Sequence, residues 1–198
     1  MAVGFFPPAA AMMLMAVAGH IASAIEVAQL HEQVKRFADT DALTGLFNRR
    51  VFFSKLEACV KRDASGDSDR ATSVIIFDVD NLKAVNDKYG HLVGDTVLTC
   101  IADKLRAGFR ACDVVARYGG DEFVVLLPGA SKEAAERRAS AVVASWSGGS
   151  VDTPSGSLPL PTASFGTAAY PVDGDEARVL LSVADDNLRK AKRDKAVR

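Results

Sequence analysis

Residues 114–127 read Val-Val-Ala-Arg-Tyr-Gly-Gly-Asp-Glu-Phe-Val-Val-Leu-Leu. Two apolar runs, 114–118 and 123–127, flank a Gly-Gly pair, and glycine accepts the positive φ that tight turns need. The pattern predicts a β-hairpin whose turn carries Asp121 and Glu122. Because this hairpin lies in the middle of the chain, it favours a mixed or antiparallel sheet over a wholly parallel one.

The segments around the hairpin predict the remaining elements of an α/β sandwich. The run Val74-Ile-Ile-Phe77 is continuously apolar, as expected of a central strand covered on both faces. Ser131 is a candidate helix cap, with Glu133 in the first turn. We expect strands at 72–77 and 162–170, helices at 48–61, 94–109, 131–146 and 175–195, and a loop rich in Gly, Ser and Pro at 148–161.

A long helix is predicted before this domain. Residues 9–37 contain no proline and one glycine, and Val27, Leu30, Val34 and Phe37 follow a three, four, three spacing. This short coiled-coil seam serves equally well to pair with a second copy or to pack on its own domain. The residues Asp39-Thr-Asp41 suit a turn and a cap, so we place a boundary between a 1–38 helix and a 39–198 domain.

The composition is that of a folded protein without a nucleic-acid surface. Of 198 residues, 48% are hydrophobic and 25% charged, and 24 Lys plus Arg oppose 25 Asp plus Glu. This balance gives no electrostatic footprint for duplex nucleic acid. The three cysteines, Cys59, Cys100 and Cys112, lack zinc-site spacing and are expected to be small apolar residues in a reducing cytoplasm.

The N-terminal residues predict neither secretion nor a membrane span. A signal peptide would need a basic segment before its apolar core, and the start of the chain has none. Residues 9–25 are almost uncharged, but they are rich in Ala and Met and interrupted by Gly19, His20 and Ser23. We therefore expect a cytoplasmic protein.

The residues with the most chemical information follow the predicted central strand. Asp78 and Asp80 lie two apart, so on a strand they share a face. If the hairpin pairs beside this strand, Asp121 and Glu122 arrive near Asp78, where the carboxylates repel one another unless a metal or protons intervene. An all-oxygen ligand set suggests Mg²⁺ or Mn²⁺ shared with substrate phosphates, and Lys83 adds positive charge for a polyphosphate.

The alternative is that these aspartates are ordinary turn residues. Taken singly, Asp78, Asp80 and Asp87 are explained by caps and turns. The coincidence of a buried strand, a carboxylate cluster, a lysine and a Gly-Gly turn favours a ligand site instead.

Four motifs give the chain a clear family resemblance. They are Asp41-Ala-Leu-Thr-Gly-Leu-Phe-Asn-Arg-Arg50, the segment 78–95, Gly119-Gly-Asp-Glu-Phe123, and Ala184-Asp185 with Ala191-Lys192. In this order they resemble the GGDEF family of diguanylate cyclases over residues 39–195. The resemblance implies a fold related to nucleotidyl cyclases and the polymerase palm, a ferredoxin-type sandwich with a mostly antiparallel central sheet.

The resemblance also implies roles for individual residues. Asp78 and Asp121, with the backbone carbonyl of Val79, would hold two Mg²⁺ or Mn²⁺ ions per active site. Glu122 would support the site or assist proton removal, and both roles stay open. The implied GTP-binding residues are Lys83 and Lys192 for the triphosphate, Asn86 and Asp95 for the guanine edge, and Gly120 in the turn.

The function implied is condensation of two GTP molecules into cyclic di-GMP with release of two pyrophosphates. Each domain would hold one GTP, so the enzyme would act as a homodimer, for which the long first helix is a suitable device. Arg110 and Asp113 stand where the family carries its Arg-x-x-Asp product-binding site, with a further contact from Arg137 or Arg138. The competing interpretation of Arg110 and Asp113 is a surface salt bridge.

The chain departs from the family pattern in one place and extends beyond it in another. The arginine expected four residues after Lys192 is Ala196, which weakens triphosphate binding unless Lys195 or Arg198 compensates. Residues 22–30 resemble the closing helix of a GAF sensory domain. Two other functions remain: a degenerate domain that binds GTP or cyclic di-GMP as a regulatory module, and another nucleotidyl cyclase, although Asn86 and Asp95 argue for guanine.

Overall fold

A computed structural model describes residues 8–65, 71–146, 148–153 and 156–197, with side chains in the first helix described only at 12–15, 17–27, 29 and 39. The chain divides into two compact units, Met1–Asp39 and Thr40–Arg198. The first contains helix α1 (Pro8–Asp39). Its apolar side chains, including Met12, Ile21 and Val27, are exposed within the described part. Leu30, Val34 and Phe37 of the predicted seam lie outside the described side chains.

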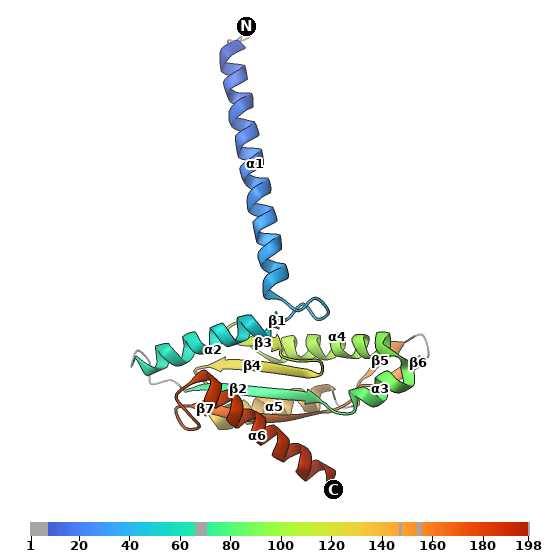
Figure 1. Cartoon of the computed structure of the whole chain (residues 1–198). Helices are drawn as coiled ribbons and strands as arrows, with labels where there is room; N and C mark the ends of the chain where they lie inside the picture. The colour runs from blue at the N-terminus through green and yellow to red at the C-terminus, as the bar shows by residue number, and fades with distance from the viewer. Residues whose placement is uncertain (1–7, 66–70, 147, 154–155, 198) are drawn as a thin grey trace, which may run out of the picture. The chain divides into compact units, whose positions relative to one another are not determined.

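The second unit is built on a five-stranded mixed sheet (Figure 1). Its strands lie in the order β1-β3-β4-β2-β7, in which only the β1–β3 pair is parallel. The strands are β1 (Phe47–Asn48), β3 (Val114–Arg117), β4 (Glu122–Pro128), β2 (Thr72–Val79) and β7 (Ala163–Tyr170). The predicted hairpin is confirmed as β3 and β4, and β4 pairs with β2 as expected.

Helices cover both faces of this sheet. One core joins Ile75, Phe77 and Phe123 to α4 (His91–Gly108) and α5 (Lys132–Trp146). The other joins Val74, Ile76 and Val124 to α2 (Arg49–Ala64) and α6 (Ala177–Ala196). Strand β2 is buried along its entire length because helices cover the sheet on both sides, as the unbroken apolar run at residues 74–77 predicts.

Local signals placed the helix starts well in two cases. Asn48 is the N-cap of α2, where its side chain accepts a hydrogen bond from the backbone N–H of Val51 at 3.1 Å. Ser131 precedes α5, and its Oγ accepts from the N–H of Ala134 at 3.3 Å. Ser131 is the cap that the sequence predicts, whereas Asn48, expected as the first helical residue, is the cap of α2 instead. Each side chain satisfies one of the free N–H groups of the first turn.

Two predictions about elements were wrong, and one helix was not predicted. Residues 148–161 are not all loop, because β5 (Ser150–Thr153) and β6 (Gly156–Pro159) form a separate two-stranded sheet. The helix expected from residue 94 begins at His91, and a further helix, α3 (Leu82–Tyr89), precedes it. Gly90, at φ +86, separates α3 from α4, and only glycine adopts such a φ without strain.

Helix α6 lies unusually close to β7. A Cβ at Gly166 of β7 would lie 2.2 Å from the carbonyl oxygen of Ala184 and 2.3 Å from the amide nitrogen of Leu188. Both atoms belong to the helix backbone, which side-chain movement cannot relieve. The absence of a side chain at Gly166 therefore sets how α6 rests on the sheet, and α6 carries Lys192.

Among the described residues, none of the helices is both long enough and apolar enough to span a bilayer.

Candidate active site

The candidate site lies where β2 and β4 end side by side. Asp78 of β2 is the direct cross-strand partner of Glu122 of β4, so the two side chains project to the same face of the sheet. The backbone N–H of Val79 donates to the carbonyl oxygen of Asp121 at 3.1 Å, which extends the pairing into the turn. The sequence-based expectation that Asp121 and Glu122 arrive near Asp78 is confirmed.

Lys192 of α6 provides the positive charge closest to this carboxylate cluster. Its Nζ lies 2.6 Å from Oδ2 of Asp78, a residue that is only 8% exposed. Burial raises the pKa of Asp78, and the hydrogen bond and charge of Lys192 oppose that rise. The negative charges of Asp121 and Asp80 add to the increase.

Glu122 experiences the same crowding of negative charge. Burial is the largest cause that raises its pKa, followed by the charges of Asp78 and Asp121. Lys192 lowers the pKa to a smaller extent. Because the pKa of two neighbouring carboxyl groups is raised, binding of a cation or a proton at this site is electrostatically favourable.

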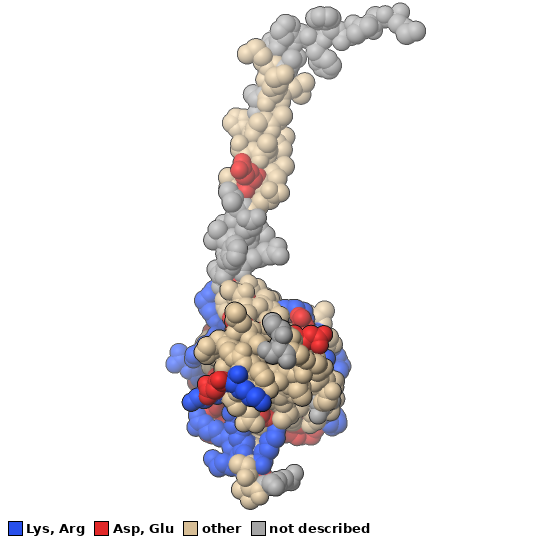
Figure 2. Space-filling view, turned by 90° about the vertical axis from the view of Figure 1, so that its right-hand side faces the viewer, with Lys and Arg blue, Asp and Glu red and all other residues tan. Residues whose placement is uncertain are grey.

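Five of the predicted site residues line one cavity of about 470 Å³, namely Asp78, Val79, Lys83, Asp121 and Lys192. Ala196 and Lys195 line it too, on the side of α6. Basic side chains gather at the lower end of Figure 2, where Figure 1 places the C-terminal end of α6. The cavity thus has carboxylates on its strand side and ammonium groups on its helix side, which is the charge arrangement that a metal-bound polyphosphate requires.

Asp80 differs from its predicted position. Strand β2 ends at Val79, so Asp80 is beyond the strand rather than on its face with Asp78. Its carboxylate accepts from the Ser164 hydroxyl at 2.8 Å and pairs with Lys195 Nζ at 2.6 Å. The Asp80 N–H still donates to the carbonyl oxygen of Thr162, which continues the pairing with β7, but β2 ends at Val79 and a turn begins at Asp80.

Asn86 and Asp95 do not line that cavity but lie close to each other on α3 and α4. Gly94, next to Asp95, faces Asn86 so closely that a Cβ there would lie 1.8 Å from Asn86 Oδ1. Asn86 Oδ1 is buried and has no hydrogen-bond partner among the described residues. An unsatisfied buried acceptor is costly, so this oxygen is suited to a donor that a ligand supplies.

The sequence analysis missed Arg117, which holds the glycine turn in place. Its Nε donates to the carbonyl oxygen of Gly119 at 3.1 Å, and its Nη2 donates to that of Gly120 at 2.7 Å. Its Nη1 lies 3.2 Å from Asp41 Oδ1. Both residues lie at family motifs, because Asp41 begins the motif at residues 41–50 and Arg117 lies just before the one at 119–123. Their contact could still not be predicted, because the sequence does not show which residues meet when they lie so far apart in the chain.

The donor set fits Mg²⁺ or Mn²⁺ provided that a substrate completes the coordination. The side chains are carboxylates, the ligands that these hard cations prefer. Within the described ranges, no three acidic, histidine or cysteine side chains converge to hold a metal by themselves. That is the usual condition for Mg²⁺, which relies on one or two protein carboxylates together with substrate phosphates.

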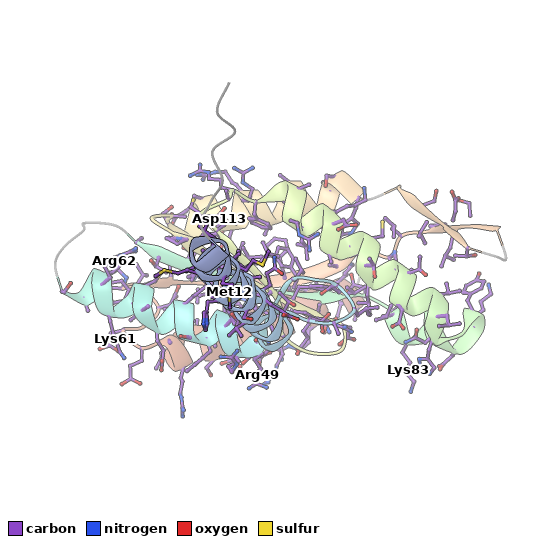
Figure 3. All side chains as sticks on the ribbon, turned by 90° about the horizontal axis from the view of Figure 1, so that it is seen from above. Met12, Arg49, Lys61, Arg62, Lys83 and Asp113 are labelled. Carbon is purple, nitrogen blue, oxygen red and sulfur yellow. The ribbon has the colours of Figure 1, made fainter. Side chains whose placement is uncertain are left out.

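The residues of the predicted product site line a different cavity. Arg110, Asp113 and Arg137 border a cavity of about 410 Å³ together with Arg138. The backbone N–H of Arg110 donates to Asp113 Oδ2 at 2.8 Å. Asp113 and Lys83 lie far apart in Figure 3, so this cavity and the carboxylate cluster are separate sites.

The chain is similar to known proteins over residues 38–198. The family model described as "Diguanylate cyclase, GGDEF domain" matches residues 38–198. Diguanylate cyclase TpbB of Pseudomonas aeruginosa is 41% identical over 157 residues, which are 79% of this chain and 35% of TpbB. Response regulator PleD of Caulobacter vibrioides is 38% identical over 156 residues, 78% of this chain and 34% of PleD. The chain thus spans about a third of the length of either relative.

A solved structure extends the likeness to the fold. The coiled coil and GGDEF domain of DgcB from Caulobacter crescentus, in complex with c-di-GMP, aligns with a TM-score of 0.83 at 26% identity. The alignment covers 92% of this chain and 95% of that one. Together with a family model that matches residues 38–198, these similarities establish that the chain belongs to the GGDEF diguanylate cyclase domain family.

Proposed function

We propose that this chain is a diguanylate cyclase, which joins two GTP molecules into cyclic di-GMP and releases two pyrophosphates. The observation that carries the proposal is the cavity shared by Asp78, Asp121, Lys83 and Lys192, with Glu122 paired beside Asp78. Its carboxylates suit Mg²⁺ and its ammonium groups suit a triphosphate. We also propose residues 1–38 as a signalling helix and 39–198 as the catalytic domain.

In each half-reaction the 3′ oxygen of one GTP bonds to the α-phosphorus of the other, and the bond to the pyrophosphate oxygen breaks. Asp78, Asp121 and the Val79 carbonyl would hold two Mg²⁺, which supply Lewis-acid stabilisation of the entering and leaving oxygens. Lys83 and Lys192 balance the charge that develops on pyrophosphate. Glu122, whose pKa is raised, is positioned to accept the hydroxyl proton directly or through water.

Guanine recognition is assigned to α3 and α4. The buried Asn86 Oδ1 has no partner among the described residues, and the guanine edge offers N–H groups that can donate to it. Asp95 is exposed next to Gly94 and accepts from the same edge. A guanine with two donors therefore fits better than an adenine, whose corresponding edge carries an acceptor.

The reaction requires two domains, because each holds one nucleotide and the 3′ hydroxyl of each must reach the phosphate of the other. We propose that a homodimer brings the two sites together, with α1 contributing to the pairing. We also propose that cyclic di-GMP inhibits the enzyme at the cavity of Arg110, Asp113 and Arg137, where guanidinium groups suit phosphate.

The deciding experiment is incubation of the chain with GTP and Mg²⁺, followed by chromatography of the nucleotides. Cyclic di-GMP and pyrophosphate should form in a ratio of about one to two, as the balanced reaction requires. Bound product is removed first, and the protein concentration is kept high enough for dimers. If purified chain under these conditions yields no cyclic di-GMP, the proposal is wrong.

The runner-up is a domain that binds GTP or cyclic di-GMP without turnover. The observation in its favour is that Ala196, which lacks a charged side chain, lines the cavity proposed for catalysis together with Lys192. GTP binding without product formation would decide for this alternative.

A further inference from the structure

A cavity larger than the one proposed for catalysis lies elsewhere in the described chain. It measures about 1010 Å³ and lies in a groove between α2 and α6, over the sheet. Ile76 and Leu181 form apolar parts of its lining, and Glu122 borders it. We call it the α2–α6 groove.

Four arginines line the α2–α6 groove, namely Arg49, Arg50, Arg178 and Arg189. Among the described residues, the carboxylates that line it are Glu122 and Asp185. Arg189 already pairs with Asp185. Among the residues that the structure describes, Arg49 and Arg178 form no ion pair with a carboxylate and instead stack on aromatic rings.

This stacking holds two guanidinium groups in defined places. The Cζ of Arg49 lies 4.5 Å from the centre of the Tyr118 ring, and that of Arg178 lies 5.9 Å from the centre of the Phe53 ring. Stacked guanidiniums keep their N–H edges available for oxygen acceptors. Figure 3 shows Arg49 at the end of α2 opposite to Lys61 and Arg62, so these other basic residues do not contribute to the groove.

The start of α2 adds to the positive potential. Arg49 and Arg50 are its first two residues, and its first turn contains no acidic side chain. The N-terminal end of a helix is already partially positive, and Arg49 adds a guanidinium there that pairs with no carboxylate among the described residues, so an anion at this position is favoured.

One face of α6 connects this groove to the candidate catalytic cavity. Ser182, Asp185 and Arg189 line the groove, and Lys192 and Ala196 line the cavity. Their spacing of three, four, three and four residues places all five on one stripe of the helix. An anion that leaves Lys192 would therefore meet Arg189 one turn earlier on the same face.

We propose that the α2–α6 groove is a metal-independent binding site for a di- or triphosphate group. Its chemistry differs from that of the catalytic cavity, because guanidinium groups bind phosphate oxygens in pairs without a bridging cation. The source of the anion rests on the proposed function: it is either the pyrophosphate that the reaction releases or the phosphates of a second nucleotide.

The test is calorimetric titration of the whole chain with inorganic pyrophosphate in EDTA at low salt, where metal-dependent binding at Asp78 and Asp121 is removed. Binding should be detected, and the double substitution Arg49→Ala with Arg178→Ala should weaken it by roughly tenfold or more. Arg110→Ala and Asp121→Asn should bind as the wild type does, and Lys190→Ala on an exposed part of α6 is the matched control.

A second variant guards against misfolding of the double substitution. Ser182→Glu places a negative charge in the groove and removes no contact of an arginine, because Ser182 is exposed on α6. It should weaken pyrophosphate binding, whereas Ser182→Ala should not. No binding by the wild type in EDTA would overturn the proposal, and so would binding by both the double variant and Ser182→Glu with the affinity of the wild type.

Parallel titration with GTP in EDTA identifies the source of the phosphate. If the chain binds GTP more tightly than pyrophosphate, and the double substitution abolishes this preference, the groove binds a nucleotide. If the affinities for GTP and pyrophosphate are equal, the groove binds pyrophosphate. Binding in EDTA needs no turnover. A chain that makes no cyclic di-GMP yet binds pyrophosphate through these arginines would therefore refute the proposed function and leave the groove site standing.

Discussion

Arg117 and Asp41 form an ion pair of 3.2 Å that joins the first turn of the domain to the glycine turn of the hairpin. The same guanidinium donates to the carbonyl oxygens of Gly119 and Gly120. Asp41 in turn accepts from the N–H and the hydroxyl of Thr44, at 2.9 and 2.7 Å. The segment that enters the domain from α1 is thus connected through one side chain to the turn that carries Asp121.

This connection predicts a coupled loss of activity. Arg117→Met should lower kcat by roughly tenfold, because two carbonyl groups of the turn lose their donor, and Asp41→Asn should have a smaller effect in the same direction. In a double-mutant cycle the two effects should be non-additive. Additive effects would show that the ion pair does not act on the turn, and Lys190→Met, at an exposed position on α6, is the control.

The contact between Arg117 and Asp41 should also make the melting temperature of the chain depend on pH. Burial opposes ionisation of Asp41, but its hydrogen bonds with Thr44 and the charge of Arg117 outweigh that effect and lower its pKa below 3.8. A carboxyl whose pKa is lower in the folded chain than in the unfolded chain stabilises the fold at any pH above its unfolded-state pKa. This contribution disappears as the pH falls through the folded-state pKa. Asp41→Asn should therefore lower Tm at pH 7 and make little difference at strongly acid pH.

Removal of Asp121, the carboxylate that we propose binds metal, should abolish turnover. Asp121→Asn is expected to reduce cyclic di-GMP formation by roughly 10²- to 10³-fold or more, because the loss of metal binding removes several kcal/mol of transition-state stabilisation. The circular dichroism spectrum should be unchanged. Asp87→Asn, at an exposed position on α3, should retain full activity. Product formation by Asp121→Asn at the wild-type rate would contradict the assignment.

Glu122 should destabilise the metal-free chain at neutral pH. Its pKa is raised by burial and by the charges of Asp78 and Asp121, so the folded chain holds this proton more tightly than the unfolded chain does. Stability then falls as pH rises from the ordinary value of 4.5 through the raised value. Glu122→Gln should raise Tm at pH 7 in EDTA but not at pH 4, while it lowers activity. Glu57→Gln on α2 serves as the comparison, and a lower Tm for Glu122→Gln at pH 7 would contradict this account.

Ala196 should limit the affinity for GTP. Ala196→Arg places a guanidinium in the cavity beside Lys192 and should lower KM by roughly threefold to tenfold with kcat little changed. Ala107→Arg, at an exposed site on α4, should leave KM unaltered. An unchanged KM in Ala196→Arg would mean that Lys195 already supplies the missing charge.

Product inhibition should depend on Arg110. Arg110→Ala is expected to raise the concentration of cyclic di-GMP that halves the rate by roughly tenfold, because the guanidinium can no longer bind product phosphate or guanine. Lys190→Ala provides a control for loss of a surface charge. Inhibition that persists unchanged in Arg110→Ala would remove the product-site proposal.

Local patterns in the sequence predicted much of this fold because they act over short distances. The hairpin follows from Gly119 and Gly120 between apolar runs, and the buried β2 follows from its unbroken apolar core. The β5–β6 pair was missed because each strand places a single apolar residue against the core, Val151 in β5 and Leu158 in β6, so neither strand shows the apolar alternation on which the prediction depends.

The candidate site could be predicted only in part. Asp78 and Glu122 were placed together because strand pairing relates them by register. The ion pairs of Lys192 with Asp78 and of Lys195 with Asp80 could not be foreseen, because they depend on how α6 packs across the sheet. The Arg117–Asp41 pair depends likewise on the relation between distant segments.

Because α6 packs closely on Gly166, the helix can neither slide along its axis nor rotate about it. Successive residues of an α-helix are rotated by about 100°, so one residue inserted between Leu188 and Lys192 would turn the ammonium group away from Asp78 by roughly that angle. The helix cannot slide or rotate to compensate, because its backbone already touches β7. The length of this short segment is therefore constrained more tightly than its composition, and insertions there should be far less tolerated than substitutions at its exposed positions.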